Sequence, residues 1–249
     1  MDATLETTIR DRIEAEKARA EPPADAVAVP LIPTGRYTDP AFHELERSRV
    51  FARTWLFVGH ESEWPTSGSY RLMSRSGAPI VVVRGKDGVL RAFYNACRHR
   101  GAPVTRDECG TSRRLTCQYH SWSYGTDGTL KSVPDARSFV GLDKDALALE
   151  PVRCETWDGW VFINEDLGAE PLLDFLGPVA EQMSEIDGPV MRAVGTQVHH
   201  LGCNWKLMVD AFLEVYHVRT VHPDNAAILY NDQATTVTML PNGHSRLTV

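Results

Sequence analysis

Two short stretches decide the fold, Cys97-Arg98-His99-Arg100-Gly101 and Cys117-Gln118-Tyr119-His120. They form the patterns C-x-H and C-x2-H, and 17 residues lie between His99 and Cys117. Two thiolates and two imidazoles on paired loops can hold one zinc ion or one [2Fe–2S] cluster. Structural zinc sites usually begin with two cysteines a few residues apart that bind the same ion. Here each loop supplies one thiolate and one imidazole, which favours a cluster with two thiolates on one iron and two imidazoles on the other.

The residues around these stretches predict a small all-β domain. Residues 80–83 are a β-branched run, Asp87-Gly88 is a hairpin turn, and residues 89–94 resume the strand pattern. Short strands separated by Gly, Asp and Ser continue to residues 160–164. The region from about residue 56 to 165 therefore predicts strands and turns throughout.

A second group of metal-binding residues follows about a hundred residues later. Glu214, His217 and His222 form E-x2-H-x4-H in a segment that predicts a helix over residues 204–220. Two histidines behind a carboxylate can supply part of the facial site of non-haem Fe(II) oxygenases. On a straight helix the two histidines would lie about 140° apart, so the helix must bend or end before both can reach one metal. Pro223 disfavours helical conformation at His222 and predicts such an end. By itself the pattern is weak, and a structural histidine pair is the alternative.

The remaining segments predict helices, a linker and a final strand. Asp39 followed by Pro40 predicts a capped helix start. No internal repeat is expected. The other predicted elements are a solvated helix at residues 5–20, a proline-rich linker at 21–33, a helix within 172–183 and a strand at 234–249.

Composition excludes several classes of function. The 249 residues predict one or two domains, and the net charge of −7 argues against a general polyanion binder such as a nucleic-acid protein. Five cysteines are few for a chain of this length, and an odd number cannot all be paired, which argues against a disulfide scaffold. Cys109, Cys154 and Cys203 are therefore expected to be free thiols. The charged N-terminus predicts no secretion signal and the sequence predicts no membrane span, so we expect a cytoplasmic location.

The first ligand pattern resembles that of the Rieske [2Fe–2S] proteins. The resemblance implies that Cys97 and Cys117 ligate one iron and that His99 and His120 ligate the other. Respiratory Rieske proteins carry an extra cysteine in each loop, and these two form a disulfide. Ala102 and Tyr119 stand at those positions in this chain, so the resemblance is to the soluble, lower-potential branch. Trp122 is expected either to shield the cluster or to serve as an ordinary core residue.

Together the two patterns resemble the catalytic (α) subunit of Rieske non-haem iron oxygenases of the aromatic ring-hydroxylating type. In that family the segment N-W-K…E-x-Y-H-x4-H carries the mononuclear iron, which implies His217 and His222 as ligands. Glu214 matches the carboxylate that bridges to the Rieske cluster of a neighbouring subunit. Asp210, one turn earlier, is expected either to support this site or to have a surface or capping role. Many members of the family have Asp at the bridging position. A Glu there resembles the subgroup that oxidises quaternary ammonium compounds. The family's third iron ligand lies further along, so the chain is expected to be about the first half of a subunit.

The resemblance implies an α+β fold made of an all-β Rieske domain and the N-terminal part of an antiparallel helix-grip catalytic domain. The expected boundaries are 1–45 for N-terminal helices and linker that pack on the catalytic domain, 46–165 for the Rieske domain and 166–249 for the incomplete catalytic domain.

The implied activity is that of a terminal oxygenase. Electrons from NAD(P)H would come through a separate reductase, with or without a ferredoxin, to the [2Fe–2S] cluster and then to a mononuclear Fe(II). The iron would activate O2 to hydroxylate a small organic substrate, either aromatic or a quaternary ammonium compound. The implied assembly is a homotrimer, with or without a β subunit. The alternatives are a Rieske electron carrier without oxygenase activity and a zinc-binding interaction module.

Overall fold

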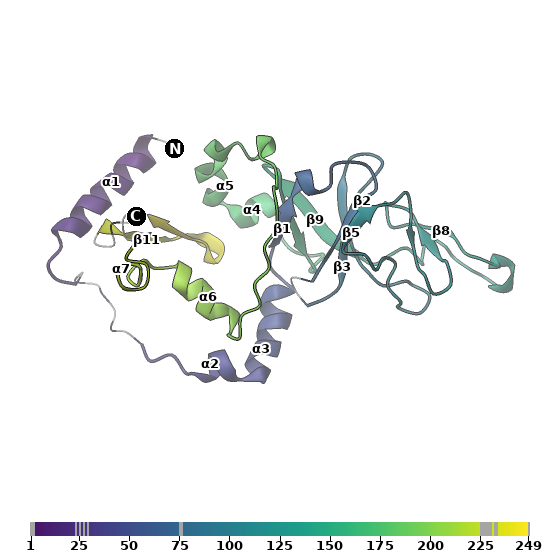
Figure 1. Ribbon diagram of the computed structural model, residues 1–249, viewed down its shortest axis with the longest axis horizontal. Coiled ribbons are helices and arrows are strands. Elements are labelled where there is room, and N and C mark those ends of the chain that lie inside the picture. Colours follow the sequence, from purple (N-terminus) through teal and green to yellow (C-terminus); the bar gives the residue numbers. More distant parts are fainter. Residues whose placement is uncertain are drawn as a thin grey trace. The chain divides into compact units, whose positions relative to one another are not determined.

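The chain folds into two compact units (Figure 1). The computed structural model describes residues 3–22, 24, 26, 28, 30–74, 77–224, 231 and 234–248. The sheet unit comprises residues 44–175 and 187–196, and the helical unit comprises residues 1–43, 176–186 and 197–249. Strands dominate the first and helices the second, so the predicted α+β class is confirmed.

The sheet unit is built from two antiparallel sheets. A seven-stranded sheet has the order β1-β10-β9-β4-β3-β2-β5, and a three-stranded sheet has the order β6-β7-β8. The larger sheet comprises β1 (Leu56–His60), β2 (Ser69–Met73), β3 (Ile80–Arg84), β4 (Leu90–Tyr94), β5 (Cys109–Thr111), β9 (Pro151–Trp157) and β10 (Trp160–Asn164). The smaller sheet comprises β6 (Leu115–Thr116), β7 (Ser123–Tyr124) and β8 (Leu130–Ser132). A short helix, α4 (Leu172–Leu176), follows β10.

Strand β3 is buried on both faces, which explains its continuous β-branched sequence. Side chains alternate across a strand, so Val81 and Val83 pack in one core while Ile80 and Val82 pack in another. All four are fully buried. The core on the Val81 side also contains Cys97 and Cys117, so the two cysteines are fixed by the packing of the domain itself.

The helical unit contains most of the helices and one strand pair. Its helices are α1 (Ala3–Ala18), α2 (Gly35–Thr38), most of α3 (Pro40–Glu46), α5 (Pro178–Gln182), α6 (Trp205–Phe212) and α7 (Val218–Val221), and its strands are β11 (Thr236–Met239) and β12 (Ser245–Thr248). The Arg12 guanidinium donates to the Thr238 hydroxyl at 2.7 Å and to the Val237 carbonyl at 3.2 Å. The N-terminal helix is therefore joined to β11 within this unit.

Three elements that were predicted to be continuous are interrupted in the structure. The expected helix over residues 204–220 divides into α6 and α7, because the Glu214 carboxylate binds the amide of His217 and starts a new helix. The expected helix within 172–183 divides at Gly177 and Pro178, since proline favours the first position of a helix. The expected strand at 234–249 is a hairpin that turns at Pro241–Gly243.

Two hairpin turns of the sheet unit share one short sequence pattern. Gly85-Lys86-Asp87-Gly88-Val89-Leu90-Arg91 and Gly125-Thr126-Asp127-Gly128-Thr129-Leu130-Lys131 both read G-x-D-G-x-L followed by a cation. In each turn the first glycine amide donates to the carbonyl four residues on, at 2.8 and 2.9 Å. The last glycine has φ of 81° and 83°, a conformation that favours glycine. We call these turns the twin hairpins.

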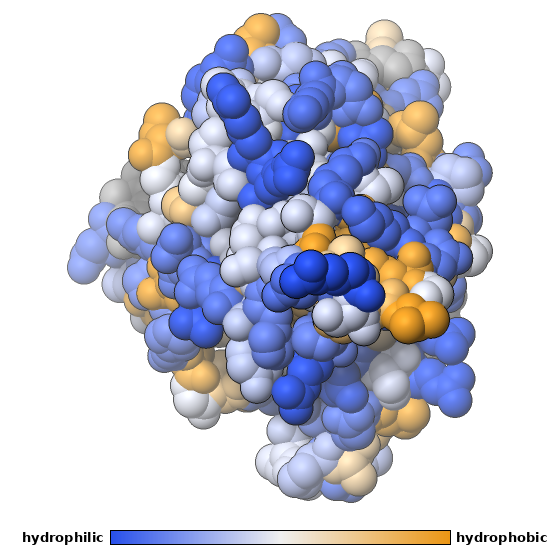
Figure 2. Space-filling view, turned by 90° about the vertical axis from the view of Figure 1, so that its right-hand side faces the viewer, coloured by the Kyte–Doolittle hydropathy of each residue, from blue (hydrophilic) through white to orange (hydrophobic). Residues whose placement is uncertain are grey.

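The surface of the sheet unit is mainly polar at the end that carries β8. Figure 2 shows hydrophilic side chains over most of this face, with separate smaller hydrophobic patches. Among the helices that the structure describes, none is both long and apolar enough to cross a bilayer.

Candidate metal centres

The cysteines of the first ligand pattern open two loops with the same backbone hydrogen bonds. The amide of Cys97 donates to the carbonyl of Ala102, and the amide of Gly101 donates back to Cys97, both at 2.8 Å. In the second loop Cys117 donates to Trp122, and Ser121 donates back to Cys117, both at 2.9 Å. Gly101 and Ser121 have φ of 73° and 58°, so each loop passes through the left-handed region at its fifth residue. The two loops therefore present their cysteines in equivalent positions.

The structure brings the four predicted ligands together as two pairs. Cys97 and Cys117 are buried, and burial raises the pKa of the Cys97 thiol, with a further increase from the adjacent Cys117. The His99 and His120 rings are 4.7 Å apart between centroids. His120 is exposed, whereas His99 is half-buried. Partial desolvation and the neighbouring His120 lower the pKa of His99, which favours the neutral, metal-binding form of the ring.

Tyr124 is a residue of this site that the sequence analysis missed. Its hydroxyl lies 3.2 Å from the Cys97 sulfur and accepts the Arg98 amide at 3.0 Å, so its proton is free to bind the sulfur. The ring is fully buried, and burial together with the Cys97 contact raises the pKa of Tyr124. The signal was present in the sequence, because Tyr124 lies two residues after Trp122 and alternate strand residues share a face.

Trp122 has the core position expected for it and also contacts a predicted ligand. Its ring is buried in the same core as the two cysteines, and it stacks on His99 with 4.8 Å between centroids and 8° between planes. Phe139 meets both rings edge-on. These aromatic contacts fix the His99 ring and cover one side of it.

The donor set fits a [2Fe–2S] cluster better than a single ion. A zinc ion needs its ligands to converge on one point, but no three His, Cys, Asp or Glu side chains do so anywhere in the described part of the chain. Paired thiols and paired imidazoles match the two irons of a Rieske cluster, and the Tyr124 hydroxyl matches the hydrogen bonding that such sulfurs accept. All five cysteines are free thiols.

The second ligand pattern lies where α6 gives way to α7. Asn204 caps α6 by accepting the Lys206 amide at 3.0 Å, and the helix ends at Phe212. His217 immediately precedes α7, and His222 immediately follows it. The helix end that Pro223 predicts at His222 is confirmed, and a further break, between Phe212 and His217, comes before it.

This bend brings Glu214, His217 and His222 together. The two imidazole rings are 5.6 Å apart between centroids. One Glu214 oxygen binds Nδ1 of His217, and the other accepts the His217 amide at 3.1 Å. The His217 contact lowers the pKa of Glu214 and leaves Nε2 of His217 available for a metal. Two imidazoles thus fit a mononuclear iron, but in the described residues no carboxylate joins them as a third ligand.

Asp210 makes its described hydrogen bond to Tyr37 and not to Glu214. Its carboxylate accepts the Tyr37 hydroxyl at 2.9 Å, and no described hydrogen bond joins it to Glu214 or His217. Tyr37 also accepts the Asn204 side-chain amide at its carbonyl, at 3.1 Å, and its ring lies 5.3 Å from the Lys206 ammonium. Tyr37 therefore contacts α6 at three points. The sequence analysis missed it, because nothing local marks a tyrosine 173 residues before its partner.

Two protein families match the two halves of this arrangement. Residues 54–153 match the Rieske [2Fe-2S] domain, and residues 190–249 match the catalytic domain of the ring hydroxylating alpha subunit. The α subunit of biphenyl 2,3-dioxygenase from Rhodococcus jostii is 37% identical over 79% of this chain and 46% of its own length. The oxygenase subunit of carnitine monooxygenase from Escherichia coli is 37% identical over 77% of this chain and 52% of its own length.

Solved structures agree with these relatives. A quaternary ammonium Rieske monooxygenase in complex with L-carnitine superposes with a TM-score of 0.74 at 34% identity, covering 78% of this chain and 56% of that one. Naphthalene 1,2-dioxygenase from a Rhodococcus species, bound to indole, superposes with a TM-score of 0.75 at 29% identity, covering 92% and 52%. The chain spans about half the length of the curated relatives it matches.

Proposed function

The chain belongs to the α subunits of Rieske oxygenases, and we propose that it carries the electron-entry domain and part of the iron site of a terminal oxygenase. The observation that carries the proposal is that one chain holds both ligand sets, the paired Cys97/Cys117 and His99/His120 and the separate His217/His222. The proposed boundaries are those predicted above, with residues 46–165 as the Rieske domain and 166–249 as the start of the catalytic domain.

The chain's own residues prepare both sites. When bound, the cluster supplies one-electron transfer and the mononuclear Fe(II) supplies activation of O2 beside an organic substrate. Tyr124 holds a proton at the Cys97 sulfur, and Trp122 fixes the His99 ring and excludes water from one side of it. Glu214 fixes the orientation of His217 through Nδ1.

Electrons are proposed to enter from a partner reductase that oxidises NAD(P)H, directly or through a ferredoxin, and to leave toward the iron of a neighbouring subunit in a homotrimer. The exposure of His120 supports such an exit, since one edge of the ligand pair faces outward. The contact of Glu214 with His217 supports its role as the near end of the bridge. Asp210 is proposed to act through Tyr37 and α6, because that is the contact it makes.

The substrate class is proposed as a small organic molecule, aromatic or quaternary ammonium. Relatives of both kinds share 37% identity with this chain, which leaves the two classes equal. Glu214 favours the quaternary ammonium class, because a glutamate at the bridging position resembles the subgroup of the family that oxidises such compounds. A competition assay that offers both substrate types to the assembled oxygenase separates them.

A second candidate is a Rieske electron carrier without oxygenase activity. It is favoured by one observation: among the described residues, no carboxylate joins His217 and His222 as a third metal ligand. Metal content tests both candidates, so the chain is purified without oxygen and assayed for iron, acid-labile sulfide and zinc, with the reduced EPR spectrum.

Two sulfides and three irons with a Rieske signal would support the oxygenase, and the third iron should be lost in His217→Ala and His222→Ala. Two irons that are unchanged in those variants would support the carrier. Zinc without sulfide would overturn both.

A further inference from the structure

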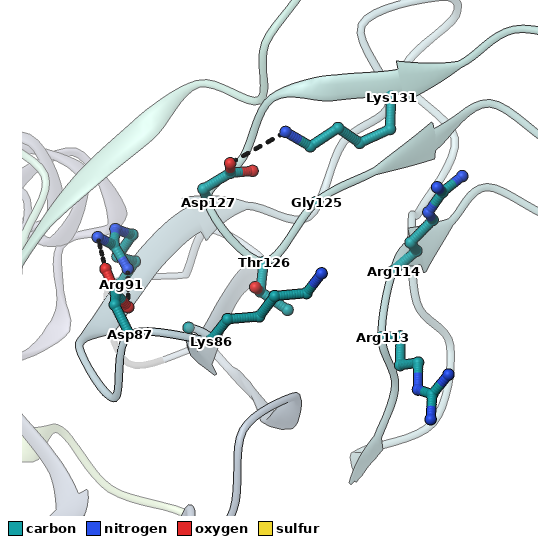
Figure 3. A pocket seen from close by; sticks show the side chains of 10 residues that line it. Lys86, Asp87, Arg91, Arg113, Arg114, Gly125, Thr126, Asp127 and Lys131 are labelled. Atoms are coloured by element: carbon teal, nitrogen blue, oxygen red, sulfur yellow. Dashed lines mark hydrogen bonds and ion pairs between the residues drawn. The ribbon is translucent and has the colours of Figure 1, made fainter.

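A basic pocket on the sheet unit is unrelated to either metal centre. It has a volume of about 240 Å³ and lies between the twin hairpins and the loop that carries Arg113 and Arg114 (Figure 3). Five cations and two carboxylates line it, which gives the pocket a net charge of +3 in a chain whose net charge is −7. A positive pocket in an acidic protein indicates a ligand of negative charge.

The two carboxylates of the pocket are already occupied. Asp87 binds the Arg91 guanidinium through both oxygens, at 2.9 and 2.6 Å, and Asp127 binds the Lys131 ammonium at 3.1 Å (Figure 3). The Arg91 contact holds the pKa of Asp87 well below its usual range. Both pairs form within their own hairpin, so Arg91 and Lys131 are neutralised locally.

Three cations of the pocket remain without such partners. The side chains of Lys86, Arg113 and Arg114 make no hydrogen bond or ion pair with the residues that the structure describes. Lys86 comes from the first of the twin hairpins, and Arg113 and Arg114 come from the loop after β5. Figure 3 places Lys86 beside Thr126 and the two arginines across from it. Charges from separate segments of the chain thus gather around one space.

Thr126 adds a buried polar group. It is only 5% exposed, it lines the pocket, and its hydroxyl has no hydrogen-bond partner in the described chain. This hydroxyl is not among the buried side-chain atoms that lack a partner in the described chain, so it keeps access to the pocket and can donate to a ligand there. Its place corresponds to that of Lys86 in the other hairpin, so the twin turns contribute one hydroxyl and one ammonium.

We propose that this pocket binds a small dianion, the phosphoryl group of inorganic phosphate or of a phosphomonoester. Arginine guanidinium groups match phosphate oxygens in geometry as well as charge, and a hydroxyl donor completes the set. The volume is below the 300–1,000 Å³ usual for drug-sized ligands, so the pocket is too small for a dinucleotide. The proposal does not depend on the oxygenase function, because none of the predicted metal ligands lines the pocket.

The test is calorimetric titration of the full chain with inorganic phosphate, at constant ionic strength set with chloride to exclude general screening. One saturable site per chain is expected. The double variant R113Q/R114Q should weaken binding at least tenfold. T126V keeps the charge and nearly the volume, and should weaken binding about fivefold by the loss of one hydrogen bond. The matched control R106Q/R137Q removes two exposed cations outside the pocket and should bind within twofold of the parent.

Glycerol phosphate distinguishes the two sources of the phosphoryl group. Tighter binding of glycerol phosphate than of phosphate would support an organic phosphomonoester, and equal binding would support the free anion. Equal weakening in R113Q/R114Q and in R106Q/R137Q would overturn the proposal, because it would mean attraction by overall charge. Absence of saturation, or binding of polyglutamate but not of phosphate, would overturn it as well.

Discussion

The loops that hold Cys97 and Cys117 and the segment that holds His217 and His222 differ in how they are fixed. Each cysteine loop closes on itself through two backbone hydrogen bonds, and both cysteines lie in the domain core. The histidine segment is a bend between two short helices, and the apolar residues around it, such as Phe212 and Val221, remain largely exposed. The two cysteine loops supply all four ligands of their site within a short stretch of chain. The histidine segment supplies only two ligands and needs a carboxylate from a distant part of the sequence.

The largest expected effect is at the cysteine loops. Replacing Cys117 with serine, or His99 with alanine, removes one of four ligands to a shared cluster, so the visible absorption and acid-labile sulfide should both be lost. The control is Cys109→Ser, which removes an exposed thiol of the same unit that contacts no predicted ligand. A Cys117→Ser protein that kept its visible spectrum would falsify the ligand assignment.

A smaller effect is expected at the histidine segment, where Glu214 acts through His217. In the assembled oxygenase, Glu214→Gln should leave iron and sulfide content unchanged but lower turnover about 10- to 100-fold, the usual loss when a group that orients a metal ligand is changed. Glu214→Asp, which keeps a carboxylate, should restore part of the rate. Glu181→Gln on α5 is the control for loss of an exposed carboxylate. Normal turnover by Glu214→Gln would remove the bridge role.

The same contrast explains how much could be predicted from the sequence. The cysteine loops were predictable because ligand spacing and turn residues are local, and strands such as β3 followed from their sequence pattern, whereas the α+β class came from the resemblance. The break between α6 and α7 was not, because it depends on a side-chain contact of Glu214 that competes with the helix. The contact of Tyr37 with Asp210 joins distant segments, and no local pattern indicates it, whereas Tyr124 was indicated only by its alternation with Trp122.

Tyr124 sharpens the comparison, because it couples the cluster loops to the core. Its hydrogen bond to the Cys97 sulfur stabilises added negative charge, so Tyr124→Phe should lower the reduction potential of the cluster. The ring stays buried, and the loss of two hydrogen bonds, to the Cys97 sulfur and from the Arg98 amide, should cost about 2 kcal/mol of unfolding free energy. Potentials are measured by redox titration against Tyr70→Phe, a change in the same core without a described contact to the sulfurs. An equal potential in both variants would mean that the Tyr124 hydroxyl does not act on the cluster.

The smallest effect is expected from Tyr37, the corresponding contact of the helical unit. Tyr37→Phe removes the hydrogen bond to Asp210 but keeps the ring beside Lys206, so amides of α6 should exchange hydrogen less than about threefold faster. Tyr216→Phe, at an 87% exposed tyrosine just after α6, is the control and should change nothing.

The Asp210 hydrogen bond raises the pKa of Tyr37, so the contact stabilises the unit fully below the ordinary tyrosine pKa of about 10 and is lost as pH rises through the raised value. The difference between Tyr37→Phe and the parent should therefore stay constant from about pH 7 to 9 and shrink only in stronger base. A difference that disappeared already between about pH 7 and 9 would show that some other group fixes α6.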